Sequence, residues 1–329
     1  MSNTTGNIIF VLGNMNSTSL VNTIVNRVSE TTEPLRVGLQ QTQKFSDGEL
    51  CVDYLDSVRG KRVFILSSPN TSDEIMLLNL AIDAAKRGAA KEIIPILPYF
   101  PYARQDKKDQ SRGPIGAKII AEMIENRGAT SVITFDLHAD QIQGFFNIPI
   151  IHIEGKNVFN DYISELNNGN LILCGPDAGS GKRVKRMQKQ LLKSNDISVN
   201  YVMLDKTRTE ANKVDSMIII GDVTGKDVII LDDMVDTAGT LCKAAEVLLD
   251  GGAKTVRAII GHPVLSGPAY ERVEASKLTE LVVSDSLPIK ESTKIKVVSV
   301  AEQISKAIVS IIGNLSYDNL KEIKKYEIK

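Results

Sequence analysis

Short aliphatic runs alternate with longer amphipathic stretches along most of the chain. Runs such as Ile93–Leu97 and Val228–Leu231 contain almost only aliphatic side chains, the composition of a parallel strand that is buried on both faces. Between such runs apolar residues recur at helical spacing, as they do from Leu241 to Leu248, where Gly251 follows the last of them. This alternation predicts an α/β fold in which parallel sheets are flanked by helices on both faces.

The alternating pattern occurs twice. Arg59–Leu66 resembles Thr224–Leu231, with a displacement of 165 residues (225 minus 60). Arg87–Ala89 resembles Gly251–Ala253 in the same way, with a displacement of 164 residues (252 minus 88). We therefore expect two similar domains and a C-terminal tail that packs back on the first. The expected domain limits are 1–155 and 156–329. Two unrelated α/β domains are the alternative.

Ligands bind at the carboxyl ends of strands in such folds, and one strand end is rich in polar groups. Asp232 and Asp233 follow Val228–Leu231, and Thr237–Thr240 then open a helix. Amide N–H groups at a helix N-terminus, threonine hydroxyls and a glycine suit a phosphate. The carboxylates would repel a lone phosphate, but they fit a ligand whose other end offers sugar hydroxyls or carries Mg²⁺. The segment predicts a sugar-phosphate site; an N-capped helix is the simpler alternative.

Composition excludes several classes of partner. The 329 residues are 43% hydrophobic and 24% charged, which is typical of a globular protein with two domain cores. The 39 Lys and Arg residues nearly balance the 40 Asp and Glu residues, so the molecule as a whole has almost no net charge. We therefore expect no nucleic acid and no membrane partner. The run Ile8–Leu12 is too short for a signal or membrane span. A cytoplasmic location is therefore the expectation, and the three scattered cysteines predict reduced, packed thiols more than a disulfide framework or a zinc site.

Two further strand ends carry candidate metal ligands. The segment 131–138 ends in His138, which is placed to bind a metal or a phosphate oxygen. The run 171–174 leads to Asp177 and a glycine-rich turn, which suit Mg²⁺ and an anion. This turn is not a Walker loop, because Arg183 stands where that motif needs Ser or Thr. A structural histidine and a simple surface turn are the respective alternatives.

Two basic clusters are weaker candidates. The loop after Pro101 contains Arg104, Lys107, Lys108 and Arg112, which could clamp a polyphosphate or form an ordinary solvated charge run. Lys206 and Arg208 follow another short strand and by themselves predict only a surface feature. The remaining histidines, His152 and His262, have no comparable context and are expected to be core or surface residues.

Taken together, these segments resemble the ribose-phosphate diphosphokinases, also called phosphoribosyl diphosphate synthetases, from about Ile8 to Tyr317. Five motifs occur in the family's order: FSDGE at 45–49, YARQD at 102–106, DLHADQIQGFF at 136–146, PDAG at 176–179 and DDMVDTAGT at 232–240. The resemblance implies two phosphoribosyltransferase-like domains. It also implies transfer of the diphosphoryl group of MgATP to the anomeric hydroxyl of ribose 5-phosphate, with release of AMP.

The resemblance also implies roles for individual residues. Ribose 5-phosphate would be bound by Arg208, Asp232, Asp233, Asp236, Thr237, Ala238, Gly239 and Thr240. ATP would be bound by Arg104 and Gln105 together with Phe45, Asp47, Gly48 and Glu49 of a neighbouring subunit. His138 and Asp177 would be Mg²⁺ ligands, and Lys206 and Arg208 would act catalytically at the reacting phosphates. The family further implies a homo-oligomer, a hexamer built from dimers, with shared active sites.

Two other kinds of protein share part of these motifs, and the sequence differs from the family pattern near its C-terminal end. A type I phosphoribosyltransferase shares the DDMVDTAGT-like loop, but it needs only one α/β half and lacks YARQD. A non-catalytic regulatory relative that binds phosphoribosyl diphosphate would lose cations such as Lys206, which is present here. The family's regulatory site is matched at Ser57 and Arg59, whereas its C-terminal Ser-x-Ser appears with Asn314 at the first position. The segment 321–329 extends beyond the usual end.

Overall fold

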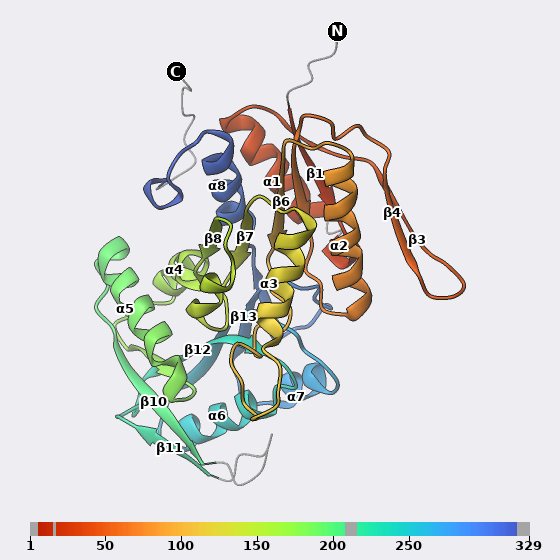
Figure 1. Cartoon of the computed structure of the whole chain (residues 1–329). Helices are drawn as coiled ribbons and strands as arrows, with labels where there is room; N and C mark the ends of the chain where they lie inside the picture. Colours follow the sequence, from red (N-terminus) through yellow and green to blue (C-terminus); the bar gives the residue numbers. More distant parts are fainter. Residues whose placement is uncertain (1–5, 16–17, 208–215, 321–329) are drawn as a thin grey trace. The chain divides into compact units, whose positions relative to one another are not determined.

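The computed structural model describes residues 6–15, 18–207 and 216–320, and these form an α/β protein of two units (Figure 1). Unit 1 comprises Met1–Glu154, Ser286–Pro288 and Val300–Lys329, and unit 2 comprises Gly155–Asp285 and Ile289–Ser299. The predicted fold class, two domains each with a parallel sheet flanked by helices, is confirmed. Unit 1 thus contains described residues from both the N-terminal and the C-terminal parts of the sequence.

The main sheet of unit 1 has the strand order β2-β1-β5-β6-β7-β8, and all neighbours are parallel. Its strands are β1 (Asn7–Val11), β2 (Leu35–Val37), β5 (Arg62–Leu66), β6 (Glu92–Leu97), β7 (Val132–Phe135) and β8 (Ile150–Ile153). Its helices are α1 (Thr18–Thr31), α2 (Ser72–Arg87), α3 (Gly116–Arg127) and α8 (Ala301–Ile312), with short 3₁₀ turns at Gly13–Met15, Asp140–Phe145 and Tyr317–Asn319. An antiparallel hairpin, β3 (Gln40–Lys44) and β4 (Leu50–Tyr54), projects from this unit.

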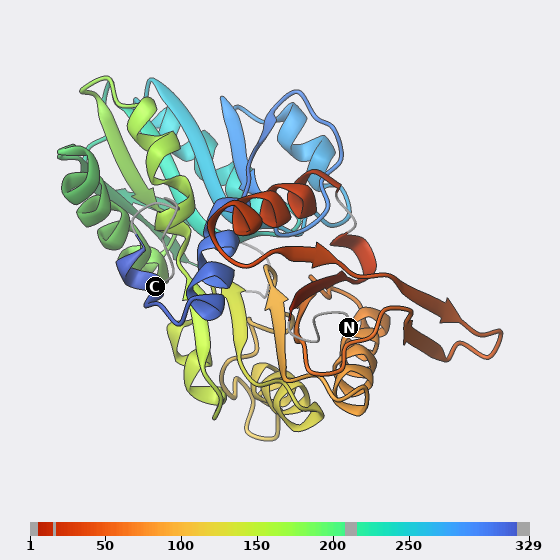
Figure 2. The same cartoon turned by 90° about the horizontal axis from the view of Figure 1, so that it is seen from above.

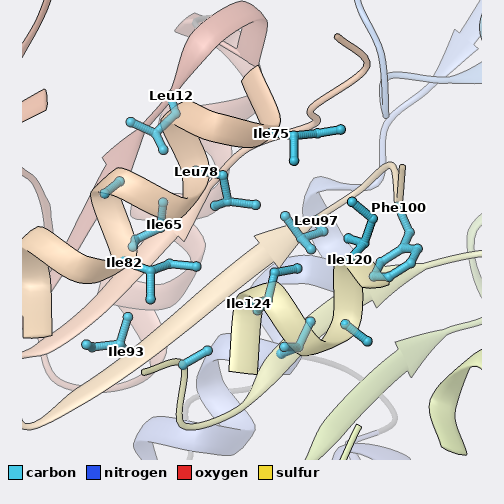
Figure 3. Packing of buried hydrophobic residues seen from close by; sticks show 14 of the residues in the cluster. Leu12, Ile65, Ile75, Leu78, Ile82, Ile93, Leu97, Phe100, Ile120 and Ile124 are labelled. Atoms are coloured by element: carbon cyan, nitrogen blue, oxygen red, sulfur yellow. The ribbon is translucent and has the colours of Figure 1, made fainter. Parts of the chain in front are cut away.

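Helices cover both faces of this sheet. α1 and α8 pack together on one face, and α2 and α3 pack together on the other (Figure 2). α2 begins with a capping box, in which the Thr71 side chain accepts from the Glu74 amide and the Glu74 carboxylate accepts from the Thr71 amide. The helix then turns Leu78 and Ile82 onto the sheet, where they are fully buried against Ile65 (Figure 3). The core of unit 1 is therefore apolar, and it combines aliphatic side chains with buried phenylalanines such as Phe10 and Phe100.

Unit 2 repeats this plan with one antiparallel edge. Its sheet has the order β11-β10-β9-β12-β13-β14-β15, and only the β10–β11 pair is antiparallel among these described strands. The strands are β9 (Leu171–Gly175), β10 (Asn200–Thr207), β11 (Ser216–Ile220), β12 (Asp227–Val235), β13 (Thr255–Pro263), β14 (Glu280–Ser284) and β15 (Ile295–Val298). The helices are α4 (Gly155–Glu165), α5 (Gly181–Asn195), α6 (Gly239–Asp250) and α7 (Ala269–Ala275), with a 3₁₀ turn at Ala178–Ser180.

The internal repeat is visible in matching backbone hydrogen bonds. The Gly60 amide donates to Ala89 and the Gly225 amide donates to Gly252, each over 2.8 Å. Ala89 and Gly252 both have positive φ, 60° and 97°. This equivalence corrects the second displacement to 163 residues (252 minus 89). The sequence comparison had paired Gly88 with Gly252, whereas Gly88 occupies the C-cap position that Gly251 occupies in unit 2.

Candidate functional site

The predicted sugar-phosphate loop follows the central strand β12 of unit 2. We expected the strand to end at Leu231, but β12 continues to Val235, and Asp232 pairs in register with Ile260 of β13. The expectation was wrong because neighbouring β13 is long enough to pair with the acidic residues. The acids therefore belong to the strand, and the helix begins at Gly239 instead of Thr237.

The acid pair is largely withdrawn from solvent. The side chain of Asp233 is buried and that of Asp232 is half-buried, while the Asp233 amide donates to the Asp232 carboxylate over 3.0 Å. Burial, followed by repulsion from the Asp233 carboxylate, raises the pKa of Asp232 well above its usual value. Arg183 offsets part of this repulsion, with its guanidinium 4.0 Å from the Asp233 carboxylate. Such a site favours a ligand that brings hydroxyl donors or positive charge.

The residues Asp236–Thr240, which we name the phosphate loop, present backbone donors. Ala238 has φ of 60°, and the first hydrogen bond of α6 runs from the Cys242 amide to the Ala238 carbonyl over 2.9 Å. The amides of residues 239–241 therefore precede the first helical donor and have no acceptor within the helix, as at any helix N-terminus. They lie at the positive end of the α6 dipole. The arrangement can bind a phosphate through backbone donors.

A second segment, which the sequence did not single out, holds the phosphate loop in place. The amides of Leu265 and Ser266 donate to the carbonyls of Val235 and Asp236, over 3.1 and 3.2 Å. The Ser266 hydroxyl donates to the Asp236 carboxylate. Arg272 of α7 donates from Nη1 to the Thr237 carbonyl over 2.9 Å. One indication of this supporting role was present in the sequence, namely the position of these residues directly after β13, the strand beside β12.

Asp177 lies in the same unit as the phosphate loop. Its carboxylate accepts from the Ser180 amide over 3.0 Å, and this closes the turn between β9 and α5. The charge of Asp177 also contributes to the raised pKa of Asp232. Arg183, which we had noted only because it breaks the Walker pattern, lies in the first turn of α5 beside the acid pair. Asp177 and Arg183 thus join the electrostatic surroundings of Asp232.

His138 lies after β7 in unit 1, beyond a tight turn. Asp136 in this turn has φ of 43°, and its amide donates to the Ile153 carbonyl of β8 over 2.8 Å. The next amide, that of Leu137, donates to Nε2 of His152 over 3.0 Å. His152 was expected to be an ordinary core or surface residue, but it supports the backbone that carries His138. An accepting Nε2 requires a neutral imidazole.

The predicted ATP residues lie in two separate places in unit 1. Arg104 is exposed, in the loop between β6 and α3. The Ala117 amide donates to the backbone carbonyl of Gln105 over 3.1 Å, and this bond connects the loop to the start of α3. Phe45, 44% exposed, stands at the tip of the β3–β4 hairpin, where Gly48 takes φ of 94°.

The hairpin tip is a compact turn. The Phe45 amide donates to the Glu49 carbonyl over 2.8 Å, and the Glu49 amide donates to the Asp47 carboxylate over 3.1 Å. These bonds fix the turn and leave the aromatic ring outside the core. The tip is therefore a preformed, exposed contact surface.

The two predicted catalytic cations are only partly covered by the structure. The backbone of Lys206 belongs to β10 and pairs with Met217 of β11, while Arg208 lies outside the described residues. Within the described part of the chain, no three His, Cys, Asp or Glu side chains gather into a metal-binding group. In the same part of the chain, no helix is long and apolar enough to cross a membrane.

Comparisons with known proteins identify the family of the chain. The chain is 47% identical over 280 residues to the ribose-phosphate pyrophosphokinase of Wolinella succinogenes, which covers 84% of this chain and 89% of that protein. The chain belongs to the ribose-phosphate pyrophosphokinase family. The family's protein from Helicobacter hepaticus is 46% identical over 297 residues, which cover 89% of this chain and 94% of that one.

Family sequence models and a solved structure agree with this assignment. Residues 9–128 match the N-terminal domain of ribose phosphate pyrophosphokinase, and residues 180–321 match the phosphoribosyl synthetase-associated domain. The crystal structure of phosphoribosylpyrophosphate synthetase from Mycobacterium smegmatis superimposes with a TM-score of 0.84 at 33% identity, covering 94% of this chain and 99% of that chain. The family resemblance predicted from the sequence is confirmed, and the chain is an enzyme of the transferase class.

Proposed function

We propose that the chain transfers the diphosphoryl group of ATP to the anomeric hydroxyl of ribose 5-phosphate, which yields 5-phosphoribosyl 1-diphosphate and AMP. The observation that carries this proposal is the β12–α6 segment, which joins a buried acid pair to a helix N-terminus in one loop. The acids suit the ribose hydroxyls and the phosphate loop suits the 5-phosphate. Membership of the ribose-phosphate pyrophosphokinase family supports the same assignment.

Catalysis of this transfer depends on alignment and charge neutralisation more than on a general base. Displacement at a phosphorus that already carries negative charge needs cations near its oxygens and an in-line nucleophile. In this proposal Lys206 and Arg208 supply the cations, and Arg104 with Gln105 holds ATP. A loop that closes over both substrates would exclude water, which competes with the sugar hydroxyl.

Magnesium is the proposed cofactor, with His138 and Asp177 as the protein ligands. Asp177 fits this role, because it provides a carboxylate oxygen close enough to Asp232 to affect its pKa, and oxygen is the donor that Mg²⁺ prefers. Mg²⁺ typically takes only one or two protein ligands and completes its shell with water and substrate phosphates, so a large cluster of protein ligands is not needed. When bound, the ion would neutralise charge on the ATP phosphates.

The proposed assembly is a homo-oligomer in which Phe45, Asp47, Gly48 and Glu49 complete the ATP site of a neighbouring subunit. The exposed ring of Phe45 on a preformed hairpin tip supports this proposal. A symmetric interface that exchanges such hairpins builds each site from two chains. The cytoplasmic location expected from composition stays a prediction.

The proposed function is tested by AMP release from ATP with and without ribose 5-phosphate, in the presence of Mg²⁺. We expect AMP to form only when both substrates are present. ATP hydrolysis to ADP, or AMP formation that is independent of the sugar phosphate, would contradict the proposal. Binding of 5-phosphoribosyl 1-diphosphate without turnover would instead favour the non-catalytic regulatory relative.

A further inference from the structure

Arg272 of α7 makes a contact with the phosphate loop that differs from the other supporting contacts. Leu265 and Ser266 bind the loop close to the end of β12, whereas Arg272 reaches it from a helix and binds the Thr237 carbonyl over 2.9 Å. The guanidinium also lies against the next part of the loop, because a Cβ added at Gly239 would lie 3.4 Å from Nη1. A cationic side chain thus lies against both Thr237 and Gly239 of the phosphate loop.

The bond to the Thr237 carbonyl fixes the orientation of the following amide. In a planar trans peptide the C=O of one residue and the N–H of the next point in opposite directions. Because Arg272 holds the Thr237 carbonyl on its own side, it directs the Ala238 N–H to the opposite side of the loop. Ala238 has φ of 60°, a costly conformation for a non-glycine residue that persists only when the surroundings impose it.

We propose that Arg272 is a positioning residue for the phosphate group of ribose 5-phosphate, an inference that rests on the function proposed above. It keeps the Thr237–Ala238 peptide plane in the orientation that aims backbone donors at the phosphate. Its charge adds positive potential to the same loop, where the α6 dipole already attracts anions. Arg272 needs no direct contact with the substrate for this role, and it has no part in binding ATP.

Steady-state kinetics of Arg272→Ala and Arg272→Lys test the inference. We expect Arg272→Ala to raise the KM for ribose 5-phosphate about tenfold, the factor that corresponds to about 1.4 kcal/mol. The KM for ATP should change by less than about twofold, within the usual spread of uncoupled sites. Arg272→Lys should recover part of the loss, because an ammonium can donate to the same carbonyl but lacks the planar guanidinium. The neighbouring exposed residue provides the matched control, Glu271→Gln, which should behave like the wild type.

Two further measurements separate the possible failures. Thermal unfolding should show that the Arg272 variants are folded at the assay temperature. A parallel rise in both KM values, a fall in kcat alone or unchanged kinetics would overturn the inference. If the wild type binds ribose 5-phosphate but releases no AMP, the proposed function fails instead. Calorimetric titration of ribose 5-phosphate into the wild type and Arg272→Ala then still tests the inference, which requires the variant to bind more weakly.

Discussion

Individual residues of the site are arranged for ligand binding at the expense of stability. Asp232 and Asp233 lie side by side in a buried strand, and the Asp232 pKa is raised by burial and by its neighbour. Ala238 occupies a left-handed conformation that favours glycine. Such strain is retained where the function needs it. Substitutions here should therefore affect stability and activity in opposite directions.

Asp232→Asn should weaken ribose 5-phosphate binding while it stabilises the free protein. Loss of a charged hydrogen bond to the sugar costs about 1.5–3 kcal/mol, so the KM for ribose 5-phosphate should rise more than that for ATP. The raised folded pKa means that Asp232 favours folding below its unfolded pKa of about 3.9 and loses this contribution as the pH rises through the folded pKa. At pH 7 the neutral amide removes the penalty, and the Tm should rise. Equal weakening of both substrates, or a lower Tm, would contradict this prediction.

His152→Ala should impair the use of MgATP, because it removes the acceptor of the Leu137 amide, and Leu137 directly precedes His138 in the chain. A buried donor left unsatisfied costs about 1–3 kcal/mol, and the turn at Asp136 would relax. We expect a higher Mg²⁺ concentration for half-maximal activity. His152→Gln offers an acceptor of similar reach and should restore most of the activity. If His152→Gln is as defective as His152→Ala, the hydrogen bond is not the cause.

At the scale of elements, local sequence patterns were enough to predict strands and helices, but they were not enough to predict which strands become neighbours. The aliphatic runs predicted the strands, and the residues of the phosphate loop could be proposed together because they are consecutive in the sequence. The supporting roles of His152 and Arg272 were missed because they depend on which strands become neighbours. The same limitation explains why β12 was predicted to end at Leu231, since its continuation depends on pairing with β13.

The repeated turn of the two units offers a paired test of backbone conformation. Gly252→Ala should lower the Tm, because a left-handed conformation costs a non-glycine residue about 1–2 kcal/mol. An added Cβ at this position meets no atom closer than 3.5 Å, so the backbone conformation is the only source of this cost. The equivalent Ala89 already carries this cost. Ala89→Gly should therefore leave the free energy of unfolding unchanged or increase it by up to about 1 kcal/mol, and the Tm should not fall. A loss of stability in Ala89→Gly would refute the structural equivalence.

At the scale of the whole molecule, the residues with proposed roles belong to both units. The phosphate loop and Asp177 belong to unit 2, while Arg104, His138 and the hairpin tip belong to unit 1. The exposed tip has an aromatic residue and acidic residues close together in one turn. Because the hairpin tip is proposed to complete the ATP site of a neighbouring subunit, activity should depend on assembly as well as on the fold of a single chain.

Mixed oligomers test whether the hairpin serves a neighbouring subunit. A chain that lacks Asp47 and Glu49 and a chain that lacks Lys206 should each be nearly inactive alone. In a hybrid dimer one site combines the Lys206 of the first chain with the intact hairpin of the second, while the other site carries both lesions. AMP formation by purified hybrids should therefore recover. No recovery in confirmed hybrids would mean that the hairpin serves its own chain or does not bind ATP.

The position of α8 in the chain has a consequence for biosynthesis. α8 packs against α1 in unit 1, yet 269 residues separate the end of α1 at Thr31 from the start of α8 at Ala301 (300 minus 31). At about 5–20 residues per second, a ribosome needs roughly 10 to 60 s to make the intervening chain. During this interval the face of α1 that α8 will cover remains exposed on the nascent chain. The helical layer over one face of the first sheet is thus completed only by α8, the last α-helix among the described residues.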